Sequence, residues 1–398
     1  KRPKLRFPGF DEPYRTTLLG EIASLVNRTD PKSNAPIMML SAGNGFIMQS
    51  EKYSRDNAGQ SLKKYILLKQ GELAYNHGAS KVKQFGCCYE LTEPEARIPY
   101  VYHCFKINED EYTPYVAMAL NNAKMDQQLK RLVSSSVRMD GLLNISFEDY
   151  MSVTLHLPSF IEQKHIADFL TKLDERIAYQ ERLITSLKKY KRGVMQHIFH
   201  RTTTQSVKAW TCVRLGDIFK KVSRRNTDGL VKNVITNSAE YGLIPQRDFF
   251  DKDIAVDGNT TNYYVIEKGD FVYNPRKSNT APYGPFNRYT LDEKGIISPL
   301  YTCLVLKADI YPSYLAWYFK SDAWHRYIYD NGSQGVRHDR VSMTDDLLMG
   351  IPVIFPDQAK QQEYADILDK IEARMQAAQK VYDLLIKEKC GYMQQLFI

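Results

Sequence analysis

The feature that most constrains the fold is an internal repeat, because the same sequence pattern occurs twice in the chain at an offset of about 198 residues. The matching segments are Leu-Gly-Glu-Ile at 19–22 with Leu-Gly-Asp-Ile at 215–218, Gly-Glu-Leu-Ala-Tyr-Asn at 71–76 with Gly-Asp-Phe-Val-Tyr-Asn at 269–274, and Gly-Val-Met-Gln-His-Ile-Phe at 193–199 with Gly-Tyr-Met-Gln-Gln-Leu-Phe at 391–397. A repeat this long exceeds the unit of a solenoid, so each copy should be a domain with the segment that follows it. The chain is predicted to fold as an internal pseudo-dimer.

Each copy contains two successive parts with different sequence patterns. Its first part carries short apolar runs broken by turn signals, which predicts a mixed α/β, strand-rich domain. Its second part carries a helical pattern. The predicted boundaries are a first domain at 1–158, a first helix at 159–200, a second domain at 201–352 and a second helix at 353–398. The length of 398 residues fits two domains, each large enough to bury a core.

The helical segments give the clearest periodic signal, since apolar residues recur there at alternating spacings of four and three. The predicted seam consists of Leu170, Leu173, Ile177, Ile184 and Leu187 in the first helix and Leu368, Ile371, Met375, Tyr382 and Leu385 in the second. Sustained heptads of this kind predict a coiled coil. Each helix, opened after a proline, would be about 50 Å long. The simplest arrangement is an antiparallel two-helix coiled coil between two mixed α/β domains; the alternative is that each helix packs only on its own domain.

One polar residue interrupts each seam at the same point of the repeat. Lys191 and Lys389 occupy equivalent heptad positions. A lysine at a core position has no packing benefit, so we expect the two to set the register of the helices or to leave room for a partner.

The sequence argues against catalysis by this chain. It contains no Asn/Asp-Pro-Pro-aromatic motif of adenine methyltransferases, no Walker A motif, no GxGxxG and no HExxH, and its six cysteines form no CxxC pair. Nuclease-like acid-x-Lys strings occur at Glu162-Gln163-Lys164 and Asp292-Glu293-Lys294, without an upstream acidic partner. We therefore expect no catalytic site, no metal site and no cofactor on this chain.

No apolar run approaches the ~18 residues that a membrane helix needs, and the basic start lacks the apolar stretch of a secretory signal. A soluble, cytoplasmic protein with reduced thiols is expected.

The candidate contact residues for a partner lie in polar, turn-rich segments. The net charge of +8 is compatible with nucleic acid without establishing it. Arg, Lys, Asn, Gln, Ser and His are residue types that read base edges or bind phosphates. The predicted DNA-binding residues are Asn44, Arg55, His77, Ser80, Lys81, Lys83, Gln84, Ser135 and Arg138 in the first copy and Asn237, Arg276, Lys277, Asn279, Arg288, Gln334, Arg337, His338 and Arg340 in the second.

The two copies differ most in these segments. Arg138 and Arg337 occupy equivalent loops, but the residues around them differ, whereas the strand starts, heptads and chain ends agree. Agreement is what a shared scaffold requires, and divergence is expected where two copies recognise different things.

Taken together, the motifs resemble those of type I restriction-modification specificity (S) subunits. The resemblance rests on Pro-Lys-Leu-Arg-Phe-Pro-Gly-Phe at 3–10, the repeated Leu-Gly-Glu/Asp-Ile, the repeated Tyr-Asn strand, Pro-x-x-x-Glu/Lys-Gln before each heptad run and Gly-x-Met-Gln near each helix end. It implies two target recognition domains that each read half of a split DNA sequence in the major groove, with the two helices as a ruler.

The resemblance also implies partners. These would be double-stranded DNA, two modification (methyltransferase) subunits that carry S-adenosylmethionine, and restriction subunits that use ATP and Mg²⁺ in the full complex. Two alternatives remain from the residues alone, namely a coiled-coil protein-interaction adaptor without DNA specificity and a nuclease with an unrecognised site.

Overall fold

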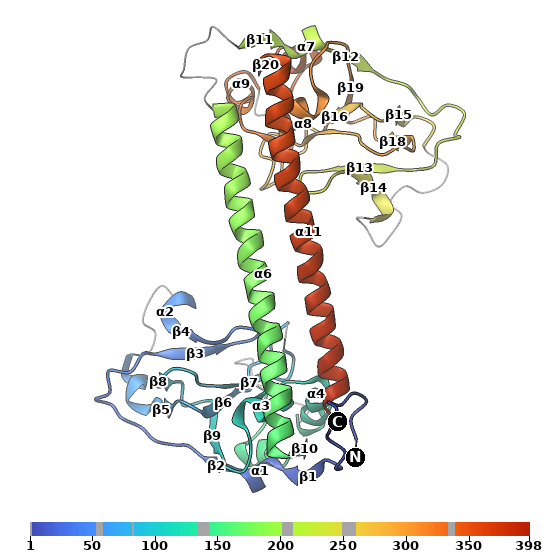
Figure 1. Cartoon of the computed structure of the whole chain (residues 1–398). Coiled ribbons are helices and arrows are strands. Elements are labelled where there is room, and N and C mark those ends of the chain that lie inside the picture. The colour runs from blue at the N-terminus through green and yellow to red at the C-terminus, as the bar shows by residue number, and fades with distance from the viewer. Residues whose placement is uncertain are drawn as a thin grey trace. The chain divides into compact units, whose positions relative to one another are not determined.

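The computed structural model of the chain divides into two compact units (Figure 1). The described residues are 2–52, 59–81, 83–133, 143–200, 210–248, 260–332 and 339–398. Unit 1 comprises Lys1–Glu181 and Lys380–Ile398, and unit 2 comprises Arg182–Gln379. Each unit therefore contains one mixed α/β domain together with parts of both long helices.

Unit 1 contains a four-stranded antiparallel sheet, three two-stranded sheets and short helices. Its elements are β1 (Arg15–Leu18), α1 (Leu19–Ile22), β2 (Ala23–Leu25), β3 (Met38–Ser41), β4 (Gly45–Met48), α2 (Gln49–Lys52), η1 (Gly59–Lys64), β5 (Ile66–Lys69), β6 (Glu72–Asn76), β7 (Cys87–Glu90), β8 (Glu95–Ile98), β9 (His103–Ile107), α3 (Thr113–Ala119), α4 (Ala123–Leu132), α5 (Phe147–Met151), β10 (Thr154–Leu157) and the start of α6 (Phe160–His200). The main sheet has the order β2-β9-β6-β7, and the pairs are β1-β10, β3-β4 and β5-β8.

Unit 2 repeats the strand order and pairing of unit 1. Its elements are β11 (Thr211–Arg214), α7 (Leu215–Ile218), β12 (Phe219–Val222), β13 (Ile235–Ser238), β14 (Gly242–Pro245), η4 (Gln246–Asp248), β15 (Tyr264–Ile266), β16 (Phe271–Tyr273), β17 (Phe286–Arg288), β18 (Gly295–Ile297), β19 (Thr302–Leu306), α8 (Pro312–Lys320), α9 (His325–Asn331), α10 (Asp345–Met349), β20 (Pro352–Phe355) and the start of α11 (Gln358–Leu396). The main sheet has the order β12-β19-β16-β17, and the pairs are β11-β20, β13-β14 and β15-β18. The predicted fold class, mixed α/β domains with long helices in an internal repeat, is confirmed.

Alternation along the central strands divides each domain between two cores. In β6, Leu73 and Tyr75 pack with the helices, while Ala74 packs on the opposite side with β5 and β8. In β16, Phe271 and Tyr273 pack with the helices and Val272 faces the other core. Because successive side chains of a strand point to opposite faces, a central strand covered on both sides is apolar throughout.

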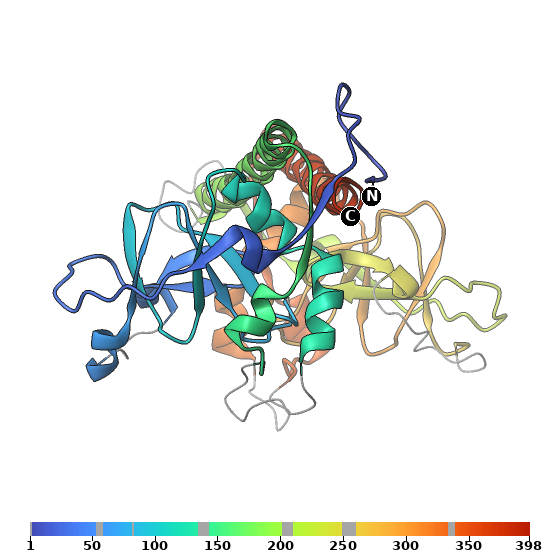
Figure 2. The same cartoon turned by 90° about the horizontal axis from the view of Figure 1, so that it is seen from below.

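The two long helices pair antiparallel inside each unit. In unit 1, Leu173 and Ile177 of α6 pack against Leu385 of α11, and the end of α11 enters the domain core through Leu396 and Phe397. Both ends of the chain lie side by side there, since the Leu5 amide donates to the Gln395 carbonyl at 3.1 Å (Figure 2). The alternative in which each helix packs only on its own domain is wrong, because the end of α11 is part of the unit 1 core.

In unit 2 the other ends of the helices meet. Ile198 and Phe199 of α6 share a core with Ala365 and Leu368 of α11. Eight seam residues are buried in this structure, and Met375 and Tyr382 are half-buried.

The two seam lysines form ion pairs with the facing helix. The Lys191 Nζ lies 2.8 Å from the Glu372 Oε2 in unit 2, and Lys389 pairs with Asp174 in unit 1. Asp174 and Glu372 are themselves equivalent in the repeat. Each helix thus supplies one lysine and one acid, and both pairs are made only in this register.

A buried glutamine attaches each long helix to its domain. The Gln163 side chain accepts from the Tyr112 amide at 2.9 Å and donates to the Pro158 carbonyl at 3.0 Å. Gln361 makes the same bonds to Tyr311 and Pro356, at 2.9 and 2.8 Å. Since Tyr112 and Tyr311 precede α3 and α8, these glutamines fix how each domain sits on its helix.

Candidate nucleic-acid interface

One loop in each unit is held by the same contacts although its sequence differs. The loops are residues 77–86, between β6 and β7, and residues 274–285, between β16 and β17. At the start of each, an asparagine side chain accepts from the amide two residues on, at 2.9 Å for both Asn76 with Gly78 and Asn274 with Arg276. This hydrogen bond fixes the backbone conformation of the turn, so the side chains that follow can differ between the two loops.

The far end of each loop is fixed by a buried tyrosine. The Tyr75 hydroxyl donates to the Phe85 carbonyl at 2.6 Å, and the Tyr273 hydroxyl donates to the Tyr283 carbonyl at 2.8 Å. The next residues, Gly86 and Gly284, have φ of +82° and +84°. A Cβ atom there would collide with the carbonyl oxygen of Asn76 or Asn274, so only glycine fits.

A second segment from each domain lies along the loop. In unit 1 the Leu143 amide donates to the His77 carbonyl at 2.9 Å, and in unit 2 the Val341 amide donates to the Pro275 carbonyl at 2.9 Å. The structure therefore brings together, in each unit, two divergent segments that are distant in sequence. Of the predicted residues, Arg55, Ser135, Arg138, Gln334, Arg337 and His338 lie outside the described residues.

In unit 1 most of the predicted residues that are described lie at the surface. Ser80, Lys81 and Gln84 are exposed on the β6–β7 loop. Lys83 is half-buried and its Nζ donates to the Asn121 carbonyl at 2.7 Å, so it also holds the loop in place. Asn44 is exposed in the β3–β4 turn, which is bonded to Tyr89 of β7 through the Gly43 amide.

His77 needs a correction. Its side chain is only 7% exposed, and its ring lies 5.0 Å from that of His103, between centroids. Burial lowers the pKa of His103, whose Nε2 contacts the Ile145 carbonyl at 2.9 Å. A histidine enclosed in this way supports the start of the loop. Its burial does not support the prediction that His77 contacts DNA.

In unit 2 the exposed predicted residues gather on the β16–β17 loop and beside it. Arg276 and Asn279 are exposed and Lys277 is half-buried. Arg340 lies directly opposite Arg276 on the neighbouring segment. Sequence reasoning treated these two stretches as separate loops, and only the backbone pairing shows that they form one surface.

Asn237 and Arg288 also need correction. Asn237 is 4% exposed; its amide donates to the Val272 carbonyl at 2.9 Å and its oxygen accepts from Asn287 at 2.7 Å. Arg288 lies opposite Phe271, at the end of the strand pair remote from the loop, and burial lowers its pKa. Asn237 therefore belongs to the interior, whereas Arg288 is half-buried and lies away from the loop.

The acid of the first nuclease-like string has a structural role as well. Glu162 is fully buried, and its two oxygens accept from Arg6 at 2.9 and 2.8 Å. This bidentate ion pair fixes the N-terminal segment on the start of α6. Among the described residues no group of His, Cys, Asp or Glu could hold a metal ion.

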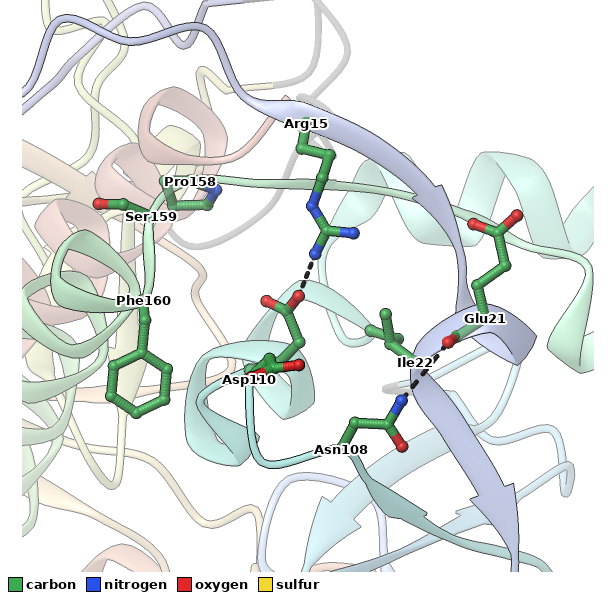
Figure 3. Close-up of a pocket in the computed structure, with 9 residues that line it drawn as sticks. Arg15, Glu21, Ile22, Asn108, Asp110, Pro158, Ser159 and Phe160 are labelled. Carbon is green, nitrogen blue, oxygen red and sulfur yellow. Dashed lines mark hydrogen bonds and ion pairs between the residues drawn. The ribbon is translucent and has the colours of Figure 1, made fainter.

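A cavity of about 400 Å³ lies where α6 begins (Figure 3). Arg15 in it is paired with Glu111, and the Asn108 amide group donates to the Glu21 carbonyl at 3.5 Å. Three of its lining residues, Glu21, Asp110 and Glu111, are acids. Since they would repel phosphate, this cavity is not part of a nucleic-acid interface.

Within the described part of the chain, no helix is long and apolar enough to cross a membrane. The exposed side chains of the described loops include hydrogen-bond donors of the types that contact nucleic acid.

Comparison with known proteins bears on the fold. No family model matches the chain. No curated protein sequence matches it either. The S subunit of a type I restriction-modification system from M. genitalium has a similar structure, with a TM-score of 0.59 at 14% identity over 100% of this chain and 99% of that one.

A second solved chain comes from work on complex assembly and conformational transition of the type I R-M system. It has a TM-score of 0.54 at 15% identity, over 97% of this chain and 98% of that one. This chain therefore has the fold of a type I restriction-modification S subunit.

Proposed function

We propose that the chain is the DNA sequence-specificity subunit of a type I restriction-modification complex, in which each unit reads one half of a bipartite target. The observation that carries the proposal is the pair of loops, 77–86 and 274–285. Their backbones are fixed by the same contacts at Asn76 and Asn274, Tyr75 and Tyr273, and Gly86 and Gly284. Their exposed side chains differ.

This combination suits recognition of two different short sequences. Phosphate contacts position a protein on DNA, whereas side chains that reach base edges in the major groove carry sequence information. One domain contacts few base pairs, each contributing about 1–3 kcal/mol of discrimination, so two domains on one chain multiply their selectivity.

We further propose that the paired helices set the number of base pairs between the half-sites and bind two modification subunits. The solved type I R-M system that this chain resembles is described in terms of complex assembly, which supports partners of this kind. S-adenosylmethionine, ATP and Mg²⁺ are expected on the modification and restriction subunits. This chain is expected to direct methylation and cleavage in the cytoplasm without catalysing either.

The test is selection from a library of random DNA duplexes by the full chain in complex with its modification subunits. The proposal predicts enrichment of one bipartite sequence with a fixed spacer. It also predicts that affinity falls at least about tenfold between 50 and 200 mM salt, because bound phosphates release their counterions. If the complex enriches no DNA sequence and its affinity for duplex DNA does not depend on salt, the chain would instead be an adaptor that binds other proteins.

A further inference from the structure

Two arginines lie directly opposite each other on adjacent backbone segments of unit 2. Arg276 and Arg340 form an isolated antiparallel bridge, which is bounded by the bond from the Val341 amide to the Pro275 carbonyl and the bond from the Lys277 amide to the Asp339 carbonyl, both 2.9 Å. Residues directly opposite in such a pair place their side chains on one face, about 4.5–5.5 Å apart at Cβ. Two like charges in this position repel, so folding alone does not explain them.

One carboxylate lies between the two guanidinium groups. The Asp339 Oδ2 is 3.9 Å from the Arg276 Nε and 3.8 Å from the Arg340 Nε. Asp339 attracts both guanidinium groups from the Nε side at distances longer than a hydrogen bond, and this leaves their terminal amino groups available to a second ligand. The three residues together carry a net charge of about +1.

One of the two arginines, Arg340, borders a hollow in the surface. Arg340 lines a cavity of about 400 Å³ together with Pro275, Leu300 and Met343. Burial raises the pKa of the nearby Tyr301 hydroxyl, and the positive charges of Arg276 and Arg340 oppose this rise. A group that enters the hollow would therefore meet Arg340 and apolar side chains, with Arg276 on the adjacent backbone segment.

The equivalent positions in unit 1 carry no such pair. The bond between Val341 and Pro275 corresponds to that between Leu143 and His77, which aligns Arg276 with Gly78. By the same offset Arg340 corresponds to sequence position 142, a leucine outside the described residues. Since the shared scaffold forms without the arginines, their role belongs to what unit 2 recognises.

The chemistry favours a base edge over a phosphate. Guanine presents two acceptors, O6 and N7, in the major groove, and an arginine fork that donates to both is the commonest specific base contact. A carboxylate between the arginines repels a phosphate but tolerates the neutral edge of guanine. An arginine fork also matches a phosphate, so the carboxylate beside the two arginines is the feature that favours a base edge.

We propose that Arg276 and Arg340 each donate to a guanine, on either strand, in the half-site read by unit 2, and that Asp339 is the positioning residue for both. This rests on the proposed function.

The experiment repeats the random-duplex selection with Arg276→Lys, Arg340→Lys and Asp339→Asn in the full complex. Each lysine variant keeps the charge but loses the fork, so we expect guanine preference to fall about 5- to 150-fold at one position of the second half-site. Asp339→Asn should weaken preference at both of those positions. The first half-site serves as an internal control and should remain unchanged in every variant.

The matched control is Arg326→Lys. Arg326 is an exposed arginine of unit 2, on α9, and it is also paired with a carboxylate, Asp330, at 3.0 Å, but it lies outside the loop surface. It should leave both half-sites intact. If a variant at Arg276, Arg340 or Asp339 still selects the first half-site and keeps the wild-type melting temperature, its change in base preference is not caused by unfolding.

Other results would overturn the inference. A uniform loss of affinity with unchanged base preference in the lysine variants would identify phosphate contacts. A wild-type bipartite motif without guanine in the second half-site would overturn the guanine assignment while leaving the proposed function standing. A wild-type complex that enriches no bipartite sequence would overturn both.

Discussion

At the scale of single residues, the backbone of each loop requires a glycine near its end, Gly86 in unit 1 and Gly284 in unit 2. Gly284 combines a φ of +84° with close approach to the Asn274 carbonyl. Gly269 has a φ of +100° but open space around it, so it offers a control in which conformational strain acts alone.

Replacement of these glycines by alanine should separate strain from collision. We expect Gly269→Ala to lower the free energy of unfolding by about 1 kcal/mol and Gly284→Ala by more than about 2 kcal/mol. Urea unfolding measures the difference. Gly284→Ala should also lower the enrichment of the second half-site in the duplex selection and leave the enrichment of the first unchanged. Equal destabilisation by the two variants would mean that the collision is relieved and that the loop is not held as described.

The residue scale is also where sequence reasoning was weakest. Asn237 and His77 have the residue types of DNA contacts and lie in turn-rich stretches, but they are buried. Sequence alone cannot distinguish a polar side chain that satisfies interior hydrogen bonds from one that faces a partner. The bridge between Arg276 and Arg340 was invisible for a related reason, since it joins residues distant along the chain.

At the scale of elements, the long helices and their seam could be predicted because heptads are a local pattern. What could not be predicted is that each seam lysine has its own acid on the facing helix, since Asp174 and Glu372 are ordinary charged residues in sequence. The environment of the two pairs differs. Lys320 of α8 is exposed and lies near the Lys191–Glu372 pair; burial raises the pKa of Glu372, but the hydrogen bond to Lys191 and the charges of Lys191 and Lys320 outweigh it and lower that pKa.

Charge reversal should therefore have different outcomes in the two units. Lys389→Glu should destabilise the chain by about 1 kcal/mol by facing Asp174 with a like charge, and adding Asp174→Lys should restore it. Reversal of Lys191 and Glu372 should restore less of the lost stability, because Lys320 interacts more strongly with position 372 than with position 191, so the exchange replaces the stronger attraction by repulsion. Double-mutant cycles from urea unfolding give both coupling energies. Full restoration at 191 and 372 would show that Lys320 does not act on this pair.

At the scale of the whole molecule, the repeat predicted the duplicated architecture because the contacts of the two loops and of the two buried glutamines recur at offsets of 198 or 199 residues. The proposed function adds that the helices determine the spacer in the DNA target. A seven-residue insertion after Thr185 in α6 and after Ala378 in α11 would keep the seam in phase. It would lengthen both helices by about 10 Å, or about three base pairs of DNA.

The double insertion should lengthen the spacer of the methylated motif by about three base pairs and leave both half-sites unchanged. Affinity should fall, because three base pairs also rotate one half-site around the DNA axis. An insertion in α6 alone is the control; it moves the ion pairs out of register and should abolish specific binding. A motif with the original spacer after the double insertion would show that the helices are not the ruler.

The most direct measurement of the central claim is the pattern of DNA methylation in a host that expresses this chain with its modification subunits. The claim that two equivalent units read two different sequences predicts one methylated motif with two dissimilar half-sites separated by a fixed number of unspecified base pairs. A single continuous motif, two identical half-sites or no methylation dependent on this chain would contradict it.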